Sequence, residues 1–508
     1  MALFTKGLNL HYKKLNESFY EIEGTPEQLQ TIARRFTVTD PTAFFNPLVK
    51  RGLKSDKIPF YVTKNKKLII PSGLIQFLSD FKIYPKYSNE FNENQIDEFI
   101  KDFKRTLPFK PYDYQELAIK ESILKQQQAI LAATGSGKSV IIAGITEFFR
   151  RQGLQTLILV PNISLTTQLL KDFKSYGLKD LHKNCRLIGG DNKDKIIDTP
   201  VTISTWQSMM KIKKYPFDAI IVDECHGLKL DTKMTDIIYK SNARFRIGCT
   251  GTMPDDEVSK MAILSCVGAP KRYIKTQGLI ERGLATPVHI NTLFLSYNSN
   301  DKALFKYVGN YAQKLKFVKE HQNRNKLIAK LSNIISQKGN TVIMCSHIQH
   351  MKDVFTEIIK LKDPTITVEE KNINSKTSLK FQEKFKVFYI AGVTSAKDRE
   401  KIIDILKKYQ NIILISNYKL FSTGINIKSL KNIIFASPLK SYTTITQSIG
   451  RAVRTHVSKN SAEIYDLVDL FGIRGDGKSG IFYHQYLNRV NKSYNSEGFP
   501  ITERTINI

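Results

Sequence analysis

The chain has 508 residues, 41% of them apolar and 24% charged, and its 77 Lys and Arg against 47 Asp and Glu give a formal net charge of +30. The apolar share is that of an ordinary folded protein, which excludes disorder along the whole chain, and at ~100–200 residues per domain the length predicts about three or four domains. Solubility needs only about 2–8 net charges per small domain. The excess of cations therefore indicates a polyanionic partner, and nucleic acid is favoured over an anionic membrane.

The sequence gives no support for secretion or membrane insertion. Lysines and a histidine interrupt the apolar residues of the first twenty positions, so no signal peptide is expected. The longest uncharged stretch, residues 153–170, contains a proline and several threonines and lacks the ~20 apolar residues of a membrane span. The five cysteines are scattered without CxxC spacing, which favours reduced thiols in a cytoplasmic protein over disulfides or a zinc site.

The first hundred residues predict a small, separate α+β domain, residues 1–100. Strand-like pieces at residues 20–22, 60–63 and 67–70 surround one helical stretch, residues 26–36. Residues 50–67 contain seven basic residues and one acid, which predicts a basic loop or hairpin. Its candidate nucleic-acid contacts are Lys50, Arg51, Lys54 and Lys57, and the alternative is a solvated surface hairpin.

From about Ala129, short apolar and β-branched runs alternate with longer helical stretches. The first set lies at residues 129–133, 156–160, 201–204, 219–222 and 245–249, and the second at residues 341–345, 388–390, 411–416, 432–436 and 462–466. Such runs are typical of buried parallel strands covered by helices. The predicted fold class is therefore α/β, with two consecutive sheet domains, residues 101–285 and 286–470, and a C-terminal extension, residues 471–508.

A glycine-containing loop joins the first predicted strand to a helix at residues 139–150. It reads Ala132, Ala133, Thr134, Gly135, Ser136, Gly137, Lys138 and Ser139. The backbone N–H groups of such a loop bind phosphates together with the dipole of the following helix. Lys138 is expected to reach the β- and γ-phosphates of a nucleotide, and Ser139 to hold Mg²⁺. Ala132 departs from the strict pattern, which has a glycine at this position.

The acids and arginines that phosphoryl transfer requires come later in the chain. Asp223 and Glu224 end an apolar run, and the carboxyl ends of parallel strands face the ligand crevice. We expect Asp223 to hold Mg²⁺, Glu224 to orient and deprotonate the attacking water, and His226 to relay from the site. Arg451 and Arg454 are i,i+3 neighbours on a predicted helix of the second sheet domain, placed to stabilise the phosphoryl group when the domains close.

In their order along the chain, these elements resemble the motifs of superfamily 2 helicases of the DExH type. The matching segments are residues 114–115 (Gln element), 132–139 (motif I), 160–168 (Ia), 204–207 (Ib), 223–226 (II), 250–252 (III), 345–347 (IV), 422–426 (V) and 447–454 (VI). The set in this order is highly specific. Together with the basic N-terminal domain and the terminal residues 504–508, it extends the resemblance to a phage recombination and branch-migration helicase over nearly the whole chain.

The resemblance implies two tandem RecA-like domains and an ATP-driven, Mg²⁺-dependent enzyme. It implies 3′→5′ translocation on DNA, fork regression, Holliday-junction branch migration and R-loop removal in phage recombination and repair. In this family Gln115 would read the adenine edge with Tyr112 stacked beside it, and Gln447 would contribute to the nucleotide site. Gly424 and Asn426 would lie between the ATP site and the strand.

The resemblance also implies contacts to the nucleic-acid track. Thr250 and Thr252 would couple the nucleotide state to this track. Backbone phosphates, read without regard to sequence, would be bound by side chains of motifs Ia and Ib, namely Thr166, Gln168, Thr205 and Gln207. Trp206 is expected either near the nucleic acid or in the core. Cys225 replaces the alanine of the DEAH form, a tolerable change because cysteine is small and often buried.

The expected partners are DNA, as a single-strand track plus the duplex arms of forks and junctions, and RNA–DNA hybrids. A monomer is expected, in the host-cell cytoplasm if the chain is phage-encoded. Three alternatives stay open: a duplex translocase that does not unwind, an RNA helicase, and a nucleic-acid-binding module whose ATP site only switches affinity. No PD…(D/E)xK nuclease pattern accompanies the motifs, which speaks against a restriction-type translocase.

Overall fold

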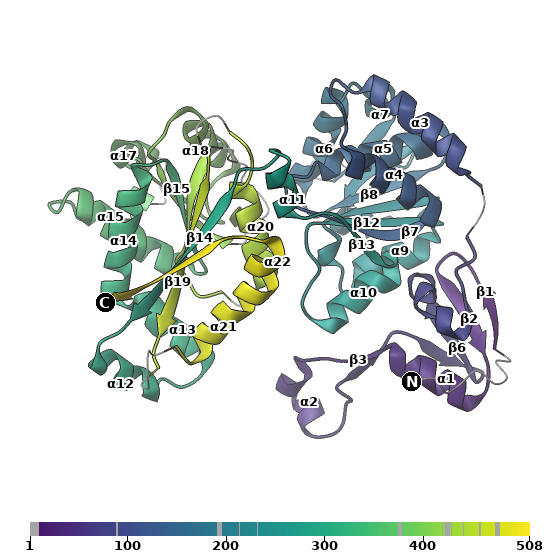
Figure 1. Cartoon of the computed structure of the whole chain (residues 1–508), viewed down its shortest axis with the longest axis horizontal. Coiled ribbons are helices and arrows are strands. Elements are labelled where there is room, and N and C mark those ends of the chain that lie inside the picture. The colour runs from purple at the N-terminus through teal and green to yellow at the C-terminus, as the bar shows by residue number, and fades with distance from the viewer. Residues whose placement is uncertain are drawn as a thin grey trace. The chain divides into compact units, whose positions relative to one another are not determined.

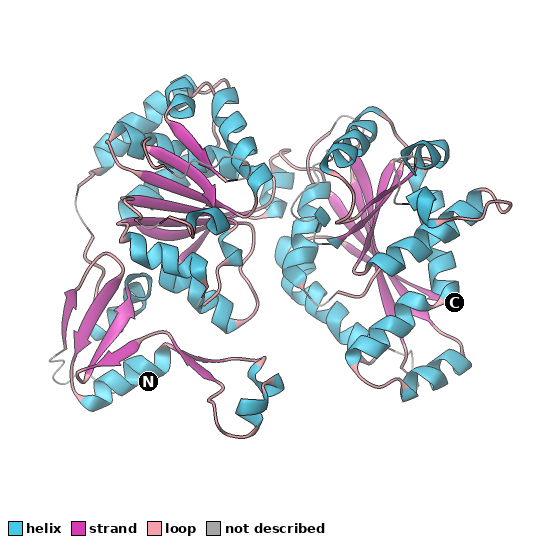
Figure 2. Cartoon of the chain, turned by 180° about the vertical axis from the view of Figure 1, so that it is seen from behind, coloured by secondary structure: helices cyan, strands magenta, loops and turns pink. Residues whose placement is uncertain are grey.

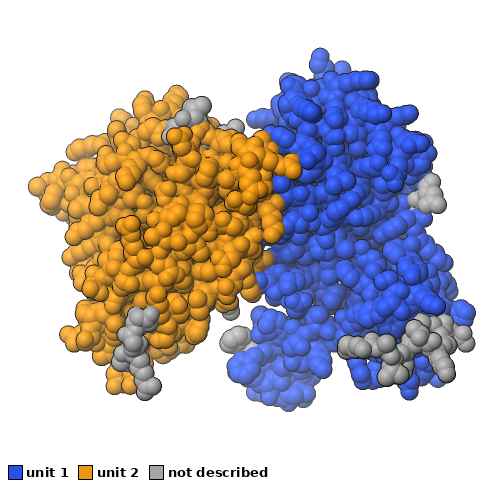
Figure 3. All heavy atoms as spheres, viewed as in Figure 1, with its two compact units in different colours: residues 1–274 blue, residues 275–508 orange. Residues whose placement is uncertain are grey.

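The computed structural model describes residues 10–508 except 88–89, 190–195, 213, 231, 374–377, 419, 422–426, 428, 440, 457–458 and 473–477. The chain divides into two compact units, Met1–Ile274 and Lys275–Ile508, coloured separately in Figure 3. The division falls after Ile274 rather than after the expected residue 285. The reason is local pairing: β13 (Pro270–Ile274) joins the first sheet, whereas the N–H of Thr276 donates to the Glu497 carboxylate in the second unit.

The first unit contains a seven-stranded sheet in the order β13-β7-β12-β11-β8-β10-β9, whose neighbouring strands are parallel (Figure 1). The other strands are β7 (Gln127–Ala132), β8 (Thr156–Val160), β9 (Cys185–Ile188), β10 (Val201–Thr205), β11 (Ala219–Asp223) and β12 (Phe245–Thr250). The helices are α3 (Glu93–Thr106), α4 (Asp113–Lys125), α5 (Lys138–Arg151), α6 (Ile163–Ser175), α7 (Lys179–Lys183), α8 (Trp206–Met209), α9 (Lys233–Ser241) and α10 (Glu257–Val267). All five expected strands are present. The edge strands β9 and β13 were not expected, because their half-exposed residues lack a continuous apolar run.

The second unit contains another parallel seven-stranded sheet, in the order β16-β17-β15-β18-β19-β14-β20 (Figure 2). Its strands are β14 (Val288–Ser296), β15 (Asn340–Cys345), β16 (Val387–Ile390), β17 (Ile413–Asn417), β18 (Leu430–Phe435), β19 (Ala462–Leu470) and β20 (Ile501–Asn507). Its helices include α11 (Thr276–Glu281), α12 (Ser299–Tyr307), α13 (Tyr311–Glu320), α14 (Gln322–Ser336), α15 (Ile348–Lys362), α16 (Glu370–Ile373), α17 (Ser378–Phe385), α18 (Ala396–Lys408), α20 (Tyr442–Ala452), α21 (Ile481–Arg489), the π-helical turn η5 (Val490–Tyr494) and α22 (Asn495–Glu497). The prediction of two parallel-sheet domains is confirmed.

The C-terminal residues are part of the second sheet domain and not an extension from it. Strand β20 pairs with β14 along one edge of the sheet. The guanidinium of Arg489 on α21 makes two 2.9 Å hydrogen bonds to the buried carboxylate of Asp466 on β19, and the Tyr494 hydroxyl donates to the same carboxylate at 2.7 Å. A charge removed from water requires such full pairing, so these residues fix the last helices to the sheet.

The N-terminal region has the expected α+β character. A four-stranded antiparallel sheet has the order β1-β2-β6-β5, and β3 and β4 form a separate two-stranded ribbon. The elements are β1 (His11–Lys14), β2 (Phe19–Glu23), α1 (Pro26–Arg35), β3 (Thr37–Thr39), η1 (Ala43–Phe45), α2 (Pro47–Lys50), β4 (Lys57–Pro59), β5 (Val62–Lys64), β6 (Lys67–Pro71), η2 (Ser72–Phe77) and η3 (Ser79–Phe81).

This region is not the separate domain that the sequence suggested, because it shares a core with α10 of the first sheet domain. Ala262 of α10 is buried within the N-terminal apolar cluster. The fully buried side chain of Arg246 on β12 crosses the junction and donates to the backbone carbonyl of Glu17 and the hydroxyl of Ser72. The N-terminal region therefore belongs structurally to the first unit.

Candidate functional site

The phosphate loop lies at the carboxyl end of β7 and opens α5. Gly137 has φ +76°, which suits glycine, and a Cβ there would lie 2.5 Å from Nε2 of Gln115. Position 137 is therefore restricted both by backbone conformation and by space. Ala132 is the last residue of β7, is fully buried and does not have a positive φ, so the missing first glycine causes no strain.

The two side chains expected to meet phosphate and metal stand at the first positions of α5. Nζ of Lys138 lies 3.2 Å from the carbonyl oxygen of Ala132, along the inside of the loop. Oγ of Ser139 lies 2.7 Å from the hydroxyl of Tyr176, the residue that follows α6. Tyr176 could not be predicted from the sequence, because no local pattern connects a tyrosine after one helix to a serine 37 positions earlier.

Gln115 stabilises the phosphate loop by a hydrogen bond to its backbone. Its side-chain oxygen accepts from the N–H of Tyr112 at 2.9 Å, and its amide nitrogen donates to the carbonyl of Ser136 at 2.8 Å. The Tyr114 hydroxyl donates to the same carbonyl at 2.7 Å. The ring of Tyr112 is partly exposed and stacks on that of Tyr114, with centroids 5.6 Å apart. Gln115 thus keeps one N–H and one lone pair for a further partner.

Asp223 and Glu224 occupy the carboxyl end of β11, on the same edge of the sheet as the loop. The carboxylate of Asp223 accepts from the N–H of Glu224 at 3.0 Å. Burial and the neighbouring Glu224 carboxylate raise the pKa of Asp223, and the nearby ammonium of Lys138 opposes this shift. Glu224 has φ +51°, an uncommon conformation for a residue with a side chain, which turns the chain sharply at this point. The structure therefore brings together the lysine and both acids predicted from the sequence.

His226 connects these acids to the next motif. Its Nδ1 lies 2.9 Å from the hydroxyl of Thr250 and 3.2 Å from the carboxylate of Glu224. The Thr250 hydroxyl in turn donates to the carbonyl of Thr252 at 3.0 Å. A continuous set of polar contacts thus runs from the second acid into the turn after β12.

Cys225 is a packing residue. It is fully buried, and burial raises the pKa of its thiol far above the usual range. A Cβ at Gly248 on neighbouring β12 would lie 2.8 Å from Sγ of Cys225. The thiol therefore fills the space that Gly248 leaves open.

The expected nucleic-acid contacts of motifs Ia and Ib divide into buried and exposed side chains. Thr166 is buried and donates its hydroxyl to the carbonyl of Ile163, and buried Thr205 caps α8 by accepting from the N–H of Ser208. Gln168 and Gln207 are exposed. The half-buried Trp206 packs against the apolar core of the first sheet domain. Of these side chains, the two glutamines are therefore the exposed ones.

In the second unit, Gln447 and Arg451 lie on α20, and Arg454 follows its end. Burial lowers the pKa of the Arg454 guanidinium. Gly424 and Asn426 lie outside the described residues. The arginines therefore lie on α20 and directly after it, and this helix has one buried face and contacts strand β18.

A lysine that no sequence motif indicates, Lys459, holds the end of this helix. Lys459 is buried, and its Nζ donates to the carbonyls of Leu430 at 2.8 Å and Ala452 at 2.5 Å. Burial and the charge of Arg454 lower the pKa of Lys459 to about 7. An ammonium at a helix C-terminus is favoured by the helix dipole, so Lys459 holds α20 against β18.

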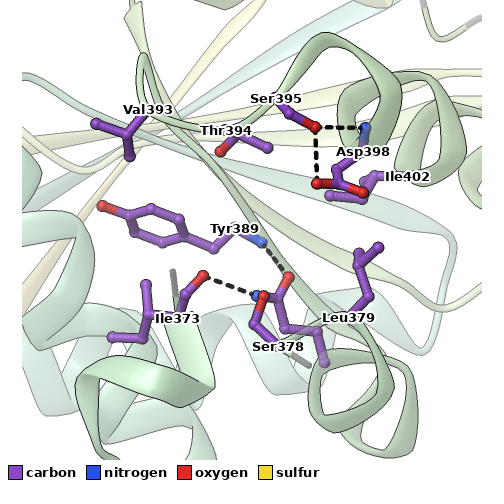
Figure 4. A pocket seen from close by; sticks show the side chains of 10 residues that line it. Ile373, Ser378, Leu379, Tyr389, Val393, Thr394, Ser395, Asp398 and Ile402 are labelled. Atoms are coloured by element: carbon purple, nitrogen blue, oxygen red, sulfur yellow. Dashed lines mark hydrogen bonds between the residues drawn. The ribbon is translucent and has the colours of Figure 1, made fainter. Parts of the chain in front are cut away.

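A separate pocket in the second unit has its polar groups engaged locally (Figure 4). The Gln382 side chain donates to the carbonyl of Ile373 and accepts from the N–H of Tyr389 at 3.1 Å, and the Ser395 hydroxyl donates to Asp398 at 2.7 Å. Across the described residues, no cluster of three or more His, Cys, Asp or Glu side chains forms a metal site. Nor does any described helix combine the length and apolarity that crossing a membrane requires.

A phosphate loop, an acid pair on the same sheet edge and a second parallel sheet carrying paired arginines define a class of protein. They are the parts of a P-loop nucleotide-binding protein with two tandem RecA-like domains.

Comparison with known proteins identifies the class more narrowly. The protein-family model described as type III restriction enzyme, res subunit, matches residues 108–255. The family model of the helicase conserved C-terminal domain matches residues 325–456. The chain carries both domains of the superfamily 2 helicases and is an ATP-dependent helicase, as the sequence predicted.

Individual relatives cover most of the chain. The ATP-dependent DNA helicase UvsW of Enterobacteria phage T4 is 28% identical over 91% of this chain and 93% of its own length. Its solved structure covers 98% of this chain and 99% of that one at 24% identity, with a TM-score of 0.46. An Acanthamoeba polyphaga mimivirus protein, L396, named among the ATP-dependent RNA helicases, is 22% identical over 89% of this chain and 81% of its own. The DNA-bound Type ISP restriction-modification enzyme LlaBIII aligns over 79% of this chain and 32% of that one at 16% identity, with a TM-score of 0.55.

Proposed function

We propose that the chain is a DNA helicase that uses Mg²⁺ and ATP to translocate 3′→5′ and remodel branched DNA, by fork regression, Holliday-junction branch migration and R-loop unwinding, in the cytoplasm of a phage-infected cell. The observation that supports DNA over other tracks is the identity to the T4 DNA helicase, 28% over 91% of this chain, against 22% over 89% for the relative named among the RNA helicases. The net charge of +30 supports a polyanionic substrate bound without sequence preference.

The residues at the phosphate loop fit Mg²⁺. A hydroxyl on Ser139 and a carboxylate on Asp223 are hard oxygen donors, and Mg²⁺ takes few protein ligands beside phosphate oxygens and water. When bound, the ion neutralises charge on the β- and γ-phosphates. Lys138 adds a second positive charge from the first turn of α5, and the Ser139 hydroxyl can direct its proton to Tyr176.

Hydrolysis is proposed to depend on Glu224. Its carboxylate would orient and deprotonate the attacking water, because it follows directly after the proposed metal ligand and is steadied by Nδ1 of His226 at 3.2 Å. Loss of the γ-phosphate would shift the Glu224 side chain. His226 would transmit this shift to Thr250, because its Nδ1 contacts the Thr250 hydroxyl. Arg451 and Arg454 would stabilise the transferred phosphoryl group in the closed state, and Lys459 would keep their helix in place.

Nucleic-acid contacts are proposed at the exposed amides of Gln168 and Gln207. Thr166, Thr205 and Trp206 would support these segments from the protein side. Alternating grip of the two sheet domains would convert closure and opening into steps along one strand. The basic residues of the N-terminal region, Lys50, Arg51, Lys54 and Lys57, would bind duplex arms, because all four are exposed.

The deciding experiment is ATP-dependent processing of forks, four-way junctions, R-loops and blunt duplex by the purified full chain. Forks, junctions and R-loops should be processed and blunt duplex left intact. Lys138→Ala should abolish turnover while DNA binding remains, and Glu224→Gln should bind ATP without hydrolysing it. Turnover without processing of any branched substrate would refute the proposed function, and full hydrolysis by Glu224→Gln would refute the role of that residue.

A duplex translocase that does not separate strands is the second candidate, favoured by the restriction-enzyme family match over residues 108–255. It predicts displacement of a third strand from a triplex with no unwinding of forks. Replacing the tracking strand by RNA in the same panel tests for an RNA helicase, which would prefer the RNA track.

A further inference from the structure

The N-terminal region carries a projecting arm, residues 37–59, whose root is firmly held. Strands β3 and β4 pair antiparallel, and the N–H of Phe60 donates to the carbonyl of Phe36 at 2.8 Å. Phe36 and Phe60 are buried in the N-terminal core, with Val38 and Ile58 packed against it. In Figures 1 and 2 the ribbon of β3 leaves this core and ends at α2. The arm is therefore anchored at one end only.

The tip of the arm is ordered by its own hydrogen bonds. The N–H of Asp40 donates to the carbonyl of Asp56 at 2.7 Å, which closes the ribbon. The Asp40 carboxylate accepts from both the N–H and the hydroxyl of Thr42, and the Asn46 side chain caps α2 by accepting from the N–H of Leu48 at 3.0 Å. The side chains at the tip are thus presented on a defined backbone.

Large apolar side chains on this tip face solvent. Phe44 is 70% exposed, Leu48 48% and Leu53 72%. A single exposed leucine needs no explanation, but three large apolar side chains within ten residues of a projecting tip form a patch. The apolar residues of the root, by contrast, are buried or half-buried. These exposed side chains are available to a binding partner.

The same tip is strongly basic. Lys50, Arg51 and Lys54 are exposed, and residues 43–55 contain no acid. Within the described part of the chain, none of the three forms a salt bridge. Nζ of Lys50 lies 5.0 Å from the centre of the Phe44 ring, so charge and aromatic surface adjoin.

This combination selects the chemistry of the partner. The cations match phosphates, while a phenyl ring and two leucines match the flat apolar faces of bases. In an intact duplex those faces are stacked inside, and apolar side chains reach them only where the stack is opened. Unpaired bases next to a duplex, as at a branch point, present both surfaces together.

We propose that the tip of the arm contacts unpaired bases at the branch point of the DNA, with Phe44, Leu48 and Leu53 against the bases and Lys50, Arg51 and Lys54 on the flanking phosphates. This rests on the proposed action on branched DNA and adds a strand-separating surface to it. The motor supplies movement along one strand, and the arm holds open the pairs ahead of it.

Two matched triple variants test the proposal in the full chain. The apolar variant carries F44S, L48S and L53S, and the charge variant carries K50S, R51S and K54S. Since all six side chains are exposed, both variants should fold, which circular dichroism and thermal melting check. 2-Aminopurine at the branch of a fork reports unstacking when protein binds without ATP, and fork processing is measured with ATP.

In the apolar variant, the fluorescence rise at the branch should vanish and fork processing should fall by about tenfold, the effect of one lost base stack, while single-strand-stimulated ATPase stays within about twofold. The charge variant should weaken duplex binding and lower the salt dependence of log K by ~0.9 per lost phosphate contact, a slope that the apolar variant keeps. Wild-type fluorescence and processing in the apolar variant would overturn the proposal. The proposal would also be overturned if either triple variant lost binding to vesicles of anionic phospholipid while its DNA binding and fork processing stayed at the wild-type level. That result would assign the tip to a membrane. If the wild type processes no branched DNA, the static fluorescence assay still tests the arm separately.

Discussion

Replacing Gln115 by glutamate tests how the nucleotide site is built. The change keeps shape and keeps an acceptor for the N–H of Tyr112, but it puts a carboxylate oxygen where the amide nitrogen donates to the carbonyl of Ser136 at 2.8 Å. Loss of one hydrogen bond costs about 1 kcal/mol net. The repulsion between the buried carboxylate oxygen and the Ser136 carbonyl oxygen, both acceptors, adds to this cost. Because Gly137 leaves no free space beside that nitrogen, the loop cannot relax easily. We expect ATP affinity to fall about tenfold, since ~1.4 kcal/mol corresponds to that factor.

The assay is equilibrium binding of a fluorescent ATP analogue, displaced by ATP and by GTP. Glu116→Gln, an isosteric change at the next position of α4, is the matched control and should bind normally, because Glu116 pairs with Lys104 away from the loop. A Gln115→Glu variant that binds ATP as tightly as the wild type would refute the support role. If Gln115 reads the adenine edge, the variant should lose more affinity for ATP than for GTP. Equal losses of affinity for the two nucleotides would refute that reading, but they would agree with support of the phosphate loop by Gln115.

Three further outcomes follow from the contacts described. Gly248→Ala should destabilise the first unit by about 1–3 kcal/mol in chemical unfolding, because its Cβ meets Sγ of Cys225 at 2.8 Å. Adding Cys225→Ala should restore part of this loss, and strict additivity of the two changes would contradict the clash. Tyr176→Phe should raise KM for Mg·ATP about fivefold by removing the 2.7 Å partner of Ser139, with the fold unchanged in thermal melting; an unchanged KM would rule out this positioning. The pKa of Lys459 is about 7 in the folded state, below its value in the unfolded state. Above pH ~7 this side chain therefore binds more protons in the unfolded state than in the folded state. Its contribution makes the free energy of unfolding rise as the pH increases toward ~10.4. Lys459→Met should lack that rise, and parallel curves for both proteins between pH 7 and 10 would show that the ammonium is not buried.

Most interior strands and the phosphate loop could be predicted because their causes are local; interior strand β14 was missed, since its first residues alternate between buried and half-buried. β8 matches its predicted residues 156–160, since a strand covered on both faces must be continuously apolar. The loop could be recognised because Gly137 and the start of α5 determine its shape within a few residues. The edge strands escaped prediction for the converse reason. Half-exposed β13 and β20 carry mixed residues, and only their neighbours β7 and β14 make them strands.

The sequence by itself determined the class of fold and the enzyme family, and it predicted the residues proposed to meet the nucleotide, because these depend on short motifs in a fixed order. Only the tertiary structure decided which side chains support them. It paired Tyr176 with Ser139, His226 with Thr250 and Lys459 with the end of α20. It also joined the N-terminal region to the first sheet domain through Arg246. These contacts link residues distant in the chain, and no periodicity or spacing records them, because their free energy comes from burial and pairing that exist only once the chain is folded.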